Sequence, residues 1–209
     1  MTRSIDYYFT LVSPWAYIGH RAFIDLAKRH DLAVTYKPVA LGTVFPESGG
    51  TPLAKRHPLR VRYRDIELQR WREKRGLSFH LKPEYWPLEP TFVDCIVVAI
   101  AAQGENVEAF LLPAFAAIFE NQMDLKDPDV VAKLLTDGGL DTAAIMKEAV
   151  APATKAIYEA NTQGALEIGV FGSPAYVLDG EVFWGQDRLD LLEDALTSGR
   201  KPFRPAIST

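Results

Sequence analysis

The sequence predicts an α/β fold in which a βαβ unit and a ββα unit bracket a large all-helical insertion. Residues 5–39 alternate between β-prone and helical segments, and residues 173–197 hold a β-hairpin followed by a helix. Nearly everything between them has a helical pattern. At 209 residues, 48% of them hydrophobic, the chain is long enough to bury a sizeable core.

The first unit begins with a β-prone segment, Ile5 to Val12, and continues with a helical segment, Trp15 to Arg29. A second strand is expected from Leu32 to Val39. Strands joined by a helical crossover pair in parallel with a right-handed connection, which predicts a βαβ unit.

The middle of the chain opens with a turn-rich stretch from Pro46 to Gly50, which predicts a loop. Apolar residues at helical spacing then predict six helices, at Leu59 to Arg75, Thr91 to Gln103, Val107 to Glu120, Pro128 to Asp137, Asp141 to Val150 and Ala151 to Gln163.

The last unit is a predicted hairpin whose strands, Ser173 to Leu178 and Glu181 to Trp184, are joined by the two residues Asp179-Gly180. A helix from Arg188 to Thr197 follows. This order is the thioredoxin topology. It predicts a discontinuous thioredoxin-like domain, residues 1–45 and 165–209, with a helical insertion domain at residues 46–164.

The bulk composition narrows the class of protein. No apolar run reaches the roughly 18–20 residues that cross a bilayer, and the N-terminus lacks the apolar stretch of a signal peptide. The single cysteine, Cys95, cannot form an internal disulfide. These features predict a cytoplasmic protein that does not bind membranes.

The charge is unevenly distributed. The segment from Lys55 to Arg75 has nine Lys and Arg against three Asp and Glu, in a chain whose net charge is −4. Such a segment can be a solvated helix face or can attract a small anion. Nucleic-acid binding is not expected, because the segment has no recognised nucleic-acid motif and the sequence pI is about 5.6.

Ser13-Pro14-Trp15-Ala16 lies where the first strand meets the first helix. A helix N-terminus offers unpaired N–H groups and a dipole that favours an anion. Strand, small nucleophilic residue, proline and helix often form thiol-handling sites, yet Ser13 and Ala16 occupy both places of a redox cysteine pair. The sequence therefore predicts that a ligand supplies any thiol.

Pro174 begins the strand that would face this helix N-terminus. A cis Ser173–Pro174 bond is expected, since it would free the main chain of Ser173 to pair with an extended peptide ligand. A trans proline opening a strand is the alternative.

Four motifs together resemble the 2-hydroxychromene-2-carboxylate isomerase family, which is close to kappa-class glutathione transferases within the DsbA-like thioredoxin superfamily. The resemblance runs from Ile5 to Leu196. Its motifs are Tyr7-x-Phe9-x-x-Val12-Ser13-Pro14-Trp15-x-Tyr17, Leu68-Gln69-Arg70-Trp71, Gly169-Val170-Phe171-Gly172-Ser173-Pro174 and Phe183-Trp184-Gly185-Gln186-Asp187-Arg188.

The resemblance implies that glutathione is the cofactor and that Ser13 hydrogen-bonds its sulfur and stabilises the thiolate. Ser173, before a cis Pro174, would pair with the glutathione main chain. The γ-glutamyl end would be held by Trp184, Gly185, Gln186 and Asp187. Asp187 can equally be the N-cap of the last helix, and the two roles are compatible.

The resemblance further implies an isomerase of aromatic compound catabolism and a homodimer. A glutathione thiolate would add to an aromatic conjugated oxo-acid, allow rotation about the former double bond, and leave. Substrate contacts would come from Phe45, Lys55, Arg56, Tyr85 and Trp86. A kappa-like glutathione transferase and a non-catalytic glutathione-binding protein are the alternatives.

Other chemistry is disfavoured by the sequence. There is no G-x-S-x-G elbow, and His20, about two helical turns beyond Ser13, is expected on the surface or in helix packing. His30, His57 and His80 lack metal-ligand spacing, so no metal is expected. Cys95 lies in an apolar helix and is expected to be a small buried hydrophobe.

Overall fold

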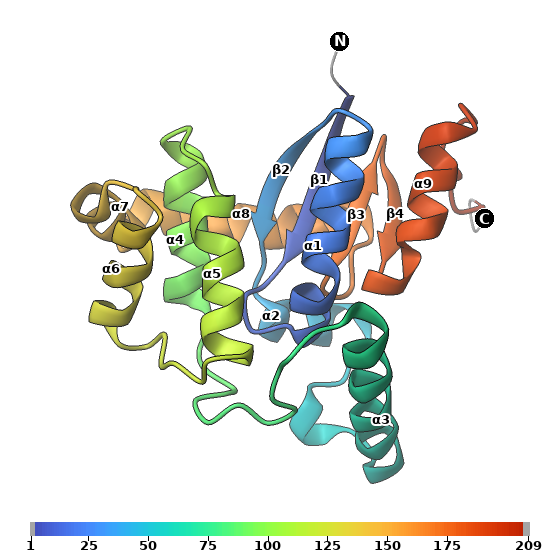
Figure 1. Cartoon of the computed structure of the whole chain (residues 1–209). Coiled ribbons are helices and arrows are strands. Elements are labelled where there is room, and N and C mark those ends of the chain that lie inside the picture. The colour runs from blue at the N-terminus through green and yellow to red at the C-terminus, as the bar shows by residue number, and fades with distance from the viewer. Residues whose placement is uncertain (1–2, 207–209) are drawn as a thin grey trace.

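A computed structural model describes residues 3–206 and has a four-stranded mixed sheet at its centre (Figure 1). The strands lie in the order β2-β1-β3-β4, with β1 parallel to β2 and antiparallel to β3. Their bounds are β1 (Arg3–Phe9), β2 (Leu32–Pro38), β3 (Ala175–Leu178) and β4 (Glu181–Trp184). The fold is thioredoxin-like with a helical insertion, as the sequence predicts.

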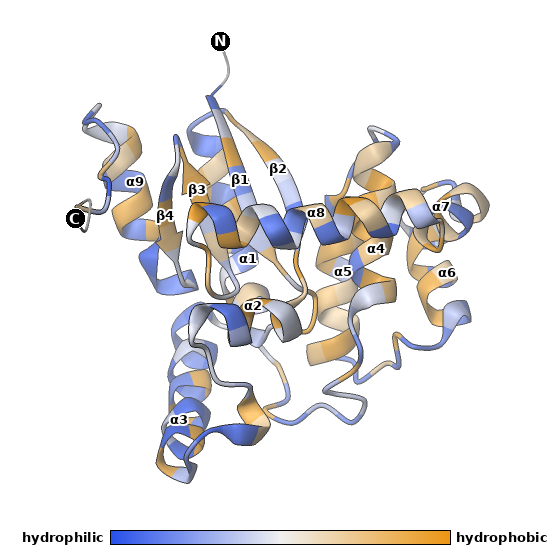
Figure 2. Cartoon of the chain, turned by 180° about the vertical axis from the view of Figure 1, so that it is seen from behind, coloured by the Kyte–Doolittle hydropathy of each residue, from blue (hydrophilic) through white to orange (hydrophobic). Residues whose placement is uncertain are grey.

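Helices cover both faces of the sheet. Figures 1 and 2 show α1 (Pro14–Arg29) and α9 (Leu189–Thr197) on one face and α8 (Pro152–Ile168) crossing the other. Successive side chains of a strand point to opposite faces. Accordingly Tyr7 and Phe9 of β1 enter the larger core, whereas Tyr8 packs with Ala165 of α8 in a smaller one.

The remaining helices lie between β2 and β3 in the chain. They are α2 (Leu41–Ser48), the short 3-10 helix η1 (Leu53–Lys55), α3 (Pro58–Arg75), α4 (Thr91–Ala102), α5 (Glu108–Phe119), α6 (Pro128–Asp137) and α7 (Thr142–Ala149). In Figure 2, α4 and α5 are largely hydrophobic and α3 largely hydrophilic. Phe115 of α5 packs against Phe9 and Tyr17, so the insertion shares one core with the sheet.

Two predicted local features are confirmed. The β1·β2 pair is parallel, and the hairpin turns on Asp179 and Gly180, which both have positive φ, 51° and 79°. Such a turn matches the twist of the flanking strands.

Four predicted bounds are wrong, and one of them is the end of α8, which continues past the predicted Gln163 to Ile168. The predicted loop at Pro46 is instead the last turn of α2, which continues to Ser48. Pro46 lacks an N–H and so removes only one helical hydrogen bond, the one to the Gly42 oxygen. The helix then ends at Gly49, which has a positive φ of 75°. β1 ends at Phe9, since residues 10–12 turn away from the sheet. The last helix begins at Leu189, after the 3-10 helix η2 (Gln186–Arg188), and has no side-chain cap, so Asp187 is not its N-cap.

Residues 45 and 165, where the predicted domain boundaries lie, fall inside α2 and α8. Among residues 3–206, no helix combines the length and apolar character that a membrane-spanning segment needs.

Candidate functional site

Ser13 sits in the turn between β1 and α1 and caps the helix. Its Oγ accepts a hydrogen bond from the Ala16 N–H (3.2 Å), and Pro14 follows as the first helical residue. The hydroxyl proton is donated to the main-chain oxygen of Ser173 (3.1 Å). Ser13 is therefore fixed at the positive end of α1, between two chain segments that lie 160 residues apart.

The Ser173–Pro174 peptide bond is cis, as predicted, and faces this turn. Ser173 Oγ accepts from the Thr10 N–H (3.2 Å), so both the side chain and the main chain of Ser173 contact the β1–α1 turn. Ser13 and Ser173 are 5% and 8% exposed, which places them in a nearly water-free contact.

The segment after β4 reaches the same place. The Gly185 N–H donates to the Pro174 oxygen (2.9 Å). Gln186 is buried against α1 at Gly19, where an added Cβ would lie only 2.5 Å from Gln186 Cβ. A residue larger than glycine at position 19 would therefore displace η2, because Gln186 Cβ is bonded directly to the main chain of η2 and cannot turn aside.

Four main-chain N–H groups at this junction have no acceptor among the described residues: those of Trp15, Ser173, Gln186 and Asp187. Those of Trp15, Gln186 and Asp187 lie in the first turns of α1 and η2, where N–H groups lack an intrahelical partner and can bind an anionic or peptide-like ligand. Ser173, Gln186 and Asp187 are among the residues predicted to bind glutathione, and that role stays a prediction. The Asp187 carboxylate is half-exposed and forms an ion pair with Arg188 (2.6 Å).

Trp86 forms a second wall beside the turn. Its Nε1–H donates to the oxygen of Val12 (2.8 Å), the residue that directly precedes Ser13. The Arg64 guanidinium lies 5.5 Å from the centre of the Trp86 ring, a cation–π distance. Pro14, Arg64 and Trp86 together line one narrow cleft.

Arg64 is unusual for an arginine in a basic helix because its side chain is only 10% exposed. Among the described residues it makes no hydrogen bond, and its carboxylate neighbour, Asp65, lies 3.6 Å away. Burial lowers the pKa of Arg64, and the nearby Arg56 lowers it further, while Asp65 raises it. An anionic ligand that accepts a hydrogen bond from this buried guanidinium would therefore bind favourably, in addition to the neighbouring Asp65 carboxylate.

The predicted substrate residues do not all gather there. Arg56 bonds the Thr51 oxygen (2.8 Å) and acts on Arg64 through its charge. Lys55 and Tyr85 are exposed. Phe45 packs against Gly50 at the end of α2. No hydrogen bond within residues 3–206 links Phe45, Lys55 or Tyr85 to the Ser13 turn.

Trp184 is 48% exposed and covers Gly172, with its ring 4.6 Å from that of Phe171. An added Cβ at Gly172 would lie 2.3 Å from Trp184 Nε1, so the close approach of this ring depends on glycine.

Sequence reasoning missed four residues: Thr10, Arg64, Arg75 and Asp94. Asp94 had a usable signal, because it is the one charged residue of the apolar helix α4. Arg75, at the end of α3, contacts the main-chain oxygen and Oε1 of Gln186 (3.4 and 3.3 Å). Thr10 and the two arginines carried no local signal, since their partners are distant in the sequence.

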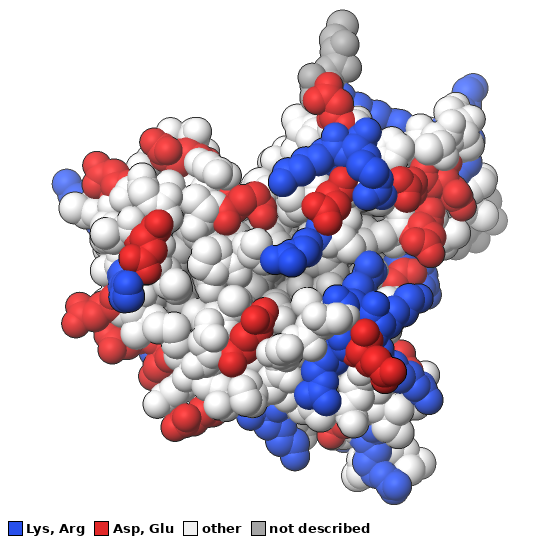
Figure 3. Space-filling model, viewed as in Figure 1, with Lys and Arg blue, Asp and Glu red and all other residues white. Residues whose placement is uncertain are grey.

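The basic segment is largely solvent-facing. Figure 3 shows Lys and Arg side chains gathered over α3, and Arg64 and Arg75 are two members that turn inward. A more open hollow on α3, lined by Gln69, Arg70 and Glu73, contains none of the residues at the Ser13 junction.

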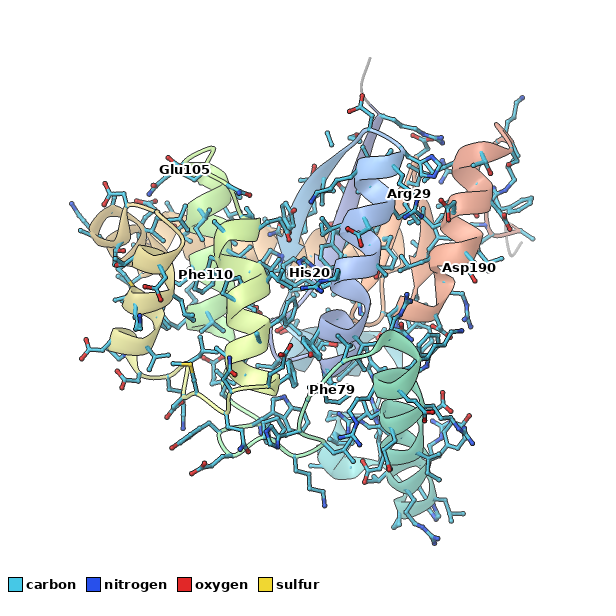
Figure 4. All side chains as sticks on the ribbon, viewed as in Figure 1. His20, Arg29, Phe79, Glu105, Phe110 and Asp190 are labelled. Carbon is cyan, nitrogen blue, oxygen red and sulfur yellow. The ribbon has the colours of Figure 1, made fainter. Side chains whose placement is uncertain are left out.

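The remaining titratable candidates are structural. His20 is buried, lies between α1 and α5 (Figure 4) and bonds Glu108 (2.8 Å), as expected of a helix-packing residue. Cys95 is 2% exposed, and burial raises the pKa of its thiol to about 11. Within the described part of the chain, no group of three His, Cys, Asp or Glu side chains could hold a metal.

Known proteins share this architecture. A family model described as a DSBA-like thioredoxin domain matches residues 4–197. The 2-hydroxychromene-2-carboxylate isomerase of Sphingobium xenophagum is 30% identical over 198 residues, covering 94% of this chain and 99% of that protein. Glutathione S-transferase kappa 1 of Caenorhabditis elegans is 25% identical over 204 residues, covering 92% and 90%. A solved structure of a 2-hydroxychromene-2-carboxylate isomerase matches with a TM-score of 0.78 and 23% identity, covering 93% and 95%.

Proposed function

Since the chain belongs to the family of DSBA-like thioredoxin domains and, within it, to the 2-hydroxychromene-2-carboxylate isomerases, we propose that it is a glutathione-dependent isomerase acting on an aromatic conjugated oxo-acid. The observation that supports this most is the junction of Ser13, the cis Ser173–Pro174 loop and the unpaired N–H groups around them.

Each part of that junction suits one part of glutathione. The Ser173 N–H and oxygen are the natural partners of the cysteinyl main chain. The N–H groups of Gln186 and Asp187 suit the γ-glutamyl carboxylate, and the Asp187 side chain suits its amino group. Trp184, half-exposed beside them, covers the same end.

Ser13 is the group that acts on the sulfur. A free thiol with a pKa of about 8.5 is only a few per cent ionised at neutral pH, and a hydroxyl donor at a helix N-terminus lowers that pKa. In the structure the Ser13 proton points to Ser173 O. When a ligand N–H occupies that oxygen, the Ser13 hydroxyl is free to turn toward the sulfur. Glutathione held there would supply a thiolate nucleophile for the conjugated substrate, and Ser13 would stabilise its negative charge.

Arg64 and Trp86 are the proposed contacts of the substrate. The guanidinium is desolvated and lacks a hydrogen-bonded anion, so it suits the substrate carboxylate, and the indole face suits the ring. The cleft is too narrow for an aromatic ring as it stands. Binding therefore requires the cleft between Arg64 and Trp86 to widen.

The test is whether glutathione is consumed. Purified protein should convert a hydroxychromene carboxylate only when glutathione is added, with total glutathione unchanged at the end. Conversion at an equal rate without glutathione would contradict the proposal. Binding of glutathione without turnover would identify a non-catalytic binding protein.

A kappa-like glutathione transferase is the second candidate, favoured by the similarity to the kappa 1 transferase. It predicts stoichiometric loss of glutathione with an electrophile such as a halonitrobenzene.

Replacing Arg64 by methionine should raise KM for the aromatic carboxylate about tenfold and leave kcat nearly unchanged, because a charge-assisted hydrogen bond is lost from substrate and transition state alike. Arg62→Met, at an exposed position of the same helix, is the matched control. Steady-state kinetics at saturating glutathione measure both. An unchanged KM in Arg64→Met would show that the carboxylate binds elsewhere.

A further inference from the structure

Asp94 is a fully buried carboxylate in the apolar helix α4, and it faces the β1–α1 turn. Its Oδ1 accepts from the Leu11 N–H (2.9 Å), and its Oδ2 accepts from the Thr10 hydroxyl (2.7 Å). From the other side, the Tyr158 hydroxyl of α8 donates to Oδ2 (3.2 Å). One side chain of the insertion thus ties two helices to the turn that precedes Ser13.

The geometry suits the ionised form of Asp94. The Leu11 N–H can only donate, and both hydroxyls lie within bonding distance of the same oxygen, so a carboxylate satisfies all three at once. If Asp94 were protonated on Oδ2, its O–H would meet the O–H groups of Thr10 and Tyr158, which both donate to that oxygen. One of these two hydroxyls would then have to rotate or move away. Thr10 is the closer of the two.

Thr10 also connects Asp94 to the junction described above. The Thr10 N–H donates to Ser173 Oγ (3.2 Å), and the Thr10 main-chain oxygen accepts from the Ser13 N–H (3.1 Å). Displacing Thr10 would therefore disturb Ser13 and Ser173 together.

We propose that Asp94, as a carboxylate, is the positioning residue that holds the β1–α1 turn so that Ser13 and Ser173 meet the ligand. This rests on the proposed glutathione site. Asp94 touches neither ligand nor substrate, and it acts only through Thr10 and Leu11.

The surroundings of Asp94 make this role sensitive to pH. Burial raises the pKa of Asp94 to about 7, against the lowering effect of its hydrogen bonds to Leu11, Thr10 and Tyr158, and the charge of Glu89 raises it further. The neighbouring Cys95 thiol and Tyr158 hydroxyl have raised pKa values and stay neutral at that pH. Asp94 is then the group facing the turn that changes charge near neutrality.

The test uses S-methylglutathione, which has no thiol to titrate, so any pH dependence near 7 belongs to the protein. Calorimetric titration of the wild type from acid to mildly alkaline pH should show affinity rising about tenfold across neutrality, the size of one charge-assisted hydrogen bond. Asp94→Asn should bind about tenfold more weakly than the wild type at the alkaline end, with a flat profile. Cys95→Ala, the next residue of the same helix, should retain the wild-type profile.

A second variant keeps the proposal testable if Asp94→Asn folds poorly. Thr10→Val keeps the shape of the side chain but removes one hydrogen bond that stabilises the carboxylate. The midpoint of the pH profile should therefore move to higher pH. A wild-type profile in either variant would overturn the positioning role.

Hydrogen exchange on the free protein separates this proposal from the glutathione site. Amides 10–13 should exchange faster in Asp94→Asn than in Cys95→Ala. If the wild type binds neither glutathione nor its S-methyl analogue, the proposed function fails. Unchanged exchange of these amides in Asp94→Asn would then overturn the role of Asp94 independently.

Discussion

Ser13→Ala should lower kcat for glutathione-dependent turnover about 100-fold, while the affinity for glutathione changes much less. Removing one donor aimed at developing negative charge costs on the order of 10²–10³ in rate. The main-chain partners of the ligand, Ser173, Gln186 and Asp187, remain in place. The group lost is the Ser13 hydroxyl, which donates to Ser173 O in the free protein.

Two measurements check this result. Steady-state kinetics give the loss of kcat, and the ultraviolet absorbance of bound thiolate against pH gives the pKa of the glutathione thiol, which should rise. If Ser13→Ala kept both the kcat and the glutathione thiol pKa of the wild type, the proposed role of Ser13 would be wrong.

A control is needed because Ser13 also caps α1, and losing a cap costs about 1 kcal/mol of stability. Asp141 has the same role at the start of α7, where its side chain accepts from the Ala144 N–H (3.0 Å). Asp141→Ala should lose similar stability and keep full activity.

The stability of the protein should fall as pH rises through the titration of Asp94. The pKa of Asp94 is about 7 in the folded protein, above its ordinary value of 3.8. Between these values the unfolded chain has released the proton that the folded protein keeps, so unfolding becomes easier as pH rises. With about 1.4 kcal/mol for each pH unit, this one residue removes about 4 kcal/mol of unfolding free energy by neutral pH.

Urea denaturation of the wild type and Asp94→Asn at mildly acidic, intermediate and neutral pH measures this contribution. The free energy of unfolding of the variant should rise relative to that of the wild type as pH rises, and the difference should level off above about pH 7. Glu181, whose pKa is lowered by Arg200, acts in the opposite direction in both proteins and cancels in the difference. Parallel curves for the two proteins would contradict the raised pKa of Asp94.

The regular elements were predictable because their signals are local. The Asp179-Gly180 turn and the apolar spacing in α4 and α5 each depend on residues close together in the chain. The errors came where distant contacts decide the outcome. Thr10 to Val12 have the composition of a strand, yet Asp94 and Trp86 bind Leu11 and Val12 in a turn.

The residues of the candidate site also differ in whether their signal is local or depends on distant contacts. Ser13, Ser173 and Pro174 belong to motifs that a sequence displays directly, and the structure brings them together. Arg64 looks like its exposed neighbours Arg60 and Arg62 in a basic helix, and only its burial against Trp86 distinguishes it. Lys55 and Tyr85 are exposed, and their contact with substrate stays a prediction.

The bonds that fix Ser13 and Leu11 join residues 160 and 83 positions apart. No short fragment of the chain can contain both partners. Each hydrogen bond closes a long loop, and only the contacts of the complete fold offset the entropy lost in closing it. Ligand binding at this junction therefore requires the N-terminal unit, the inserted helix α4 and the C-terminal unit to be assembled at once. Split or truncated versions that lack any one of the three should have no partial site.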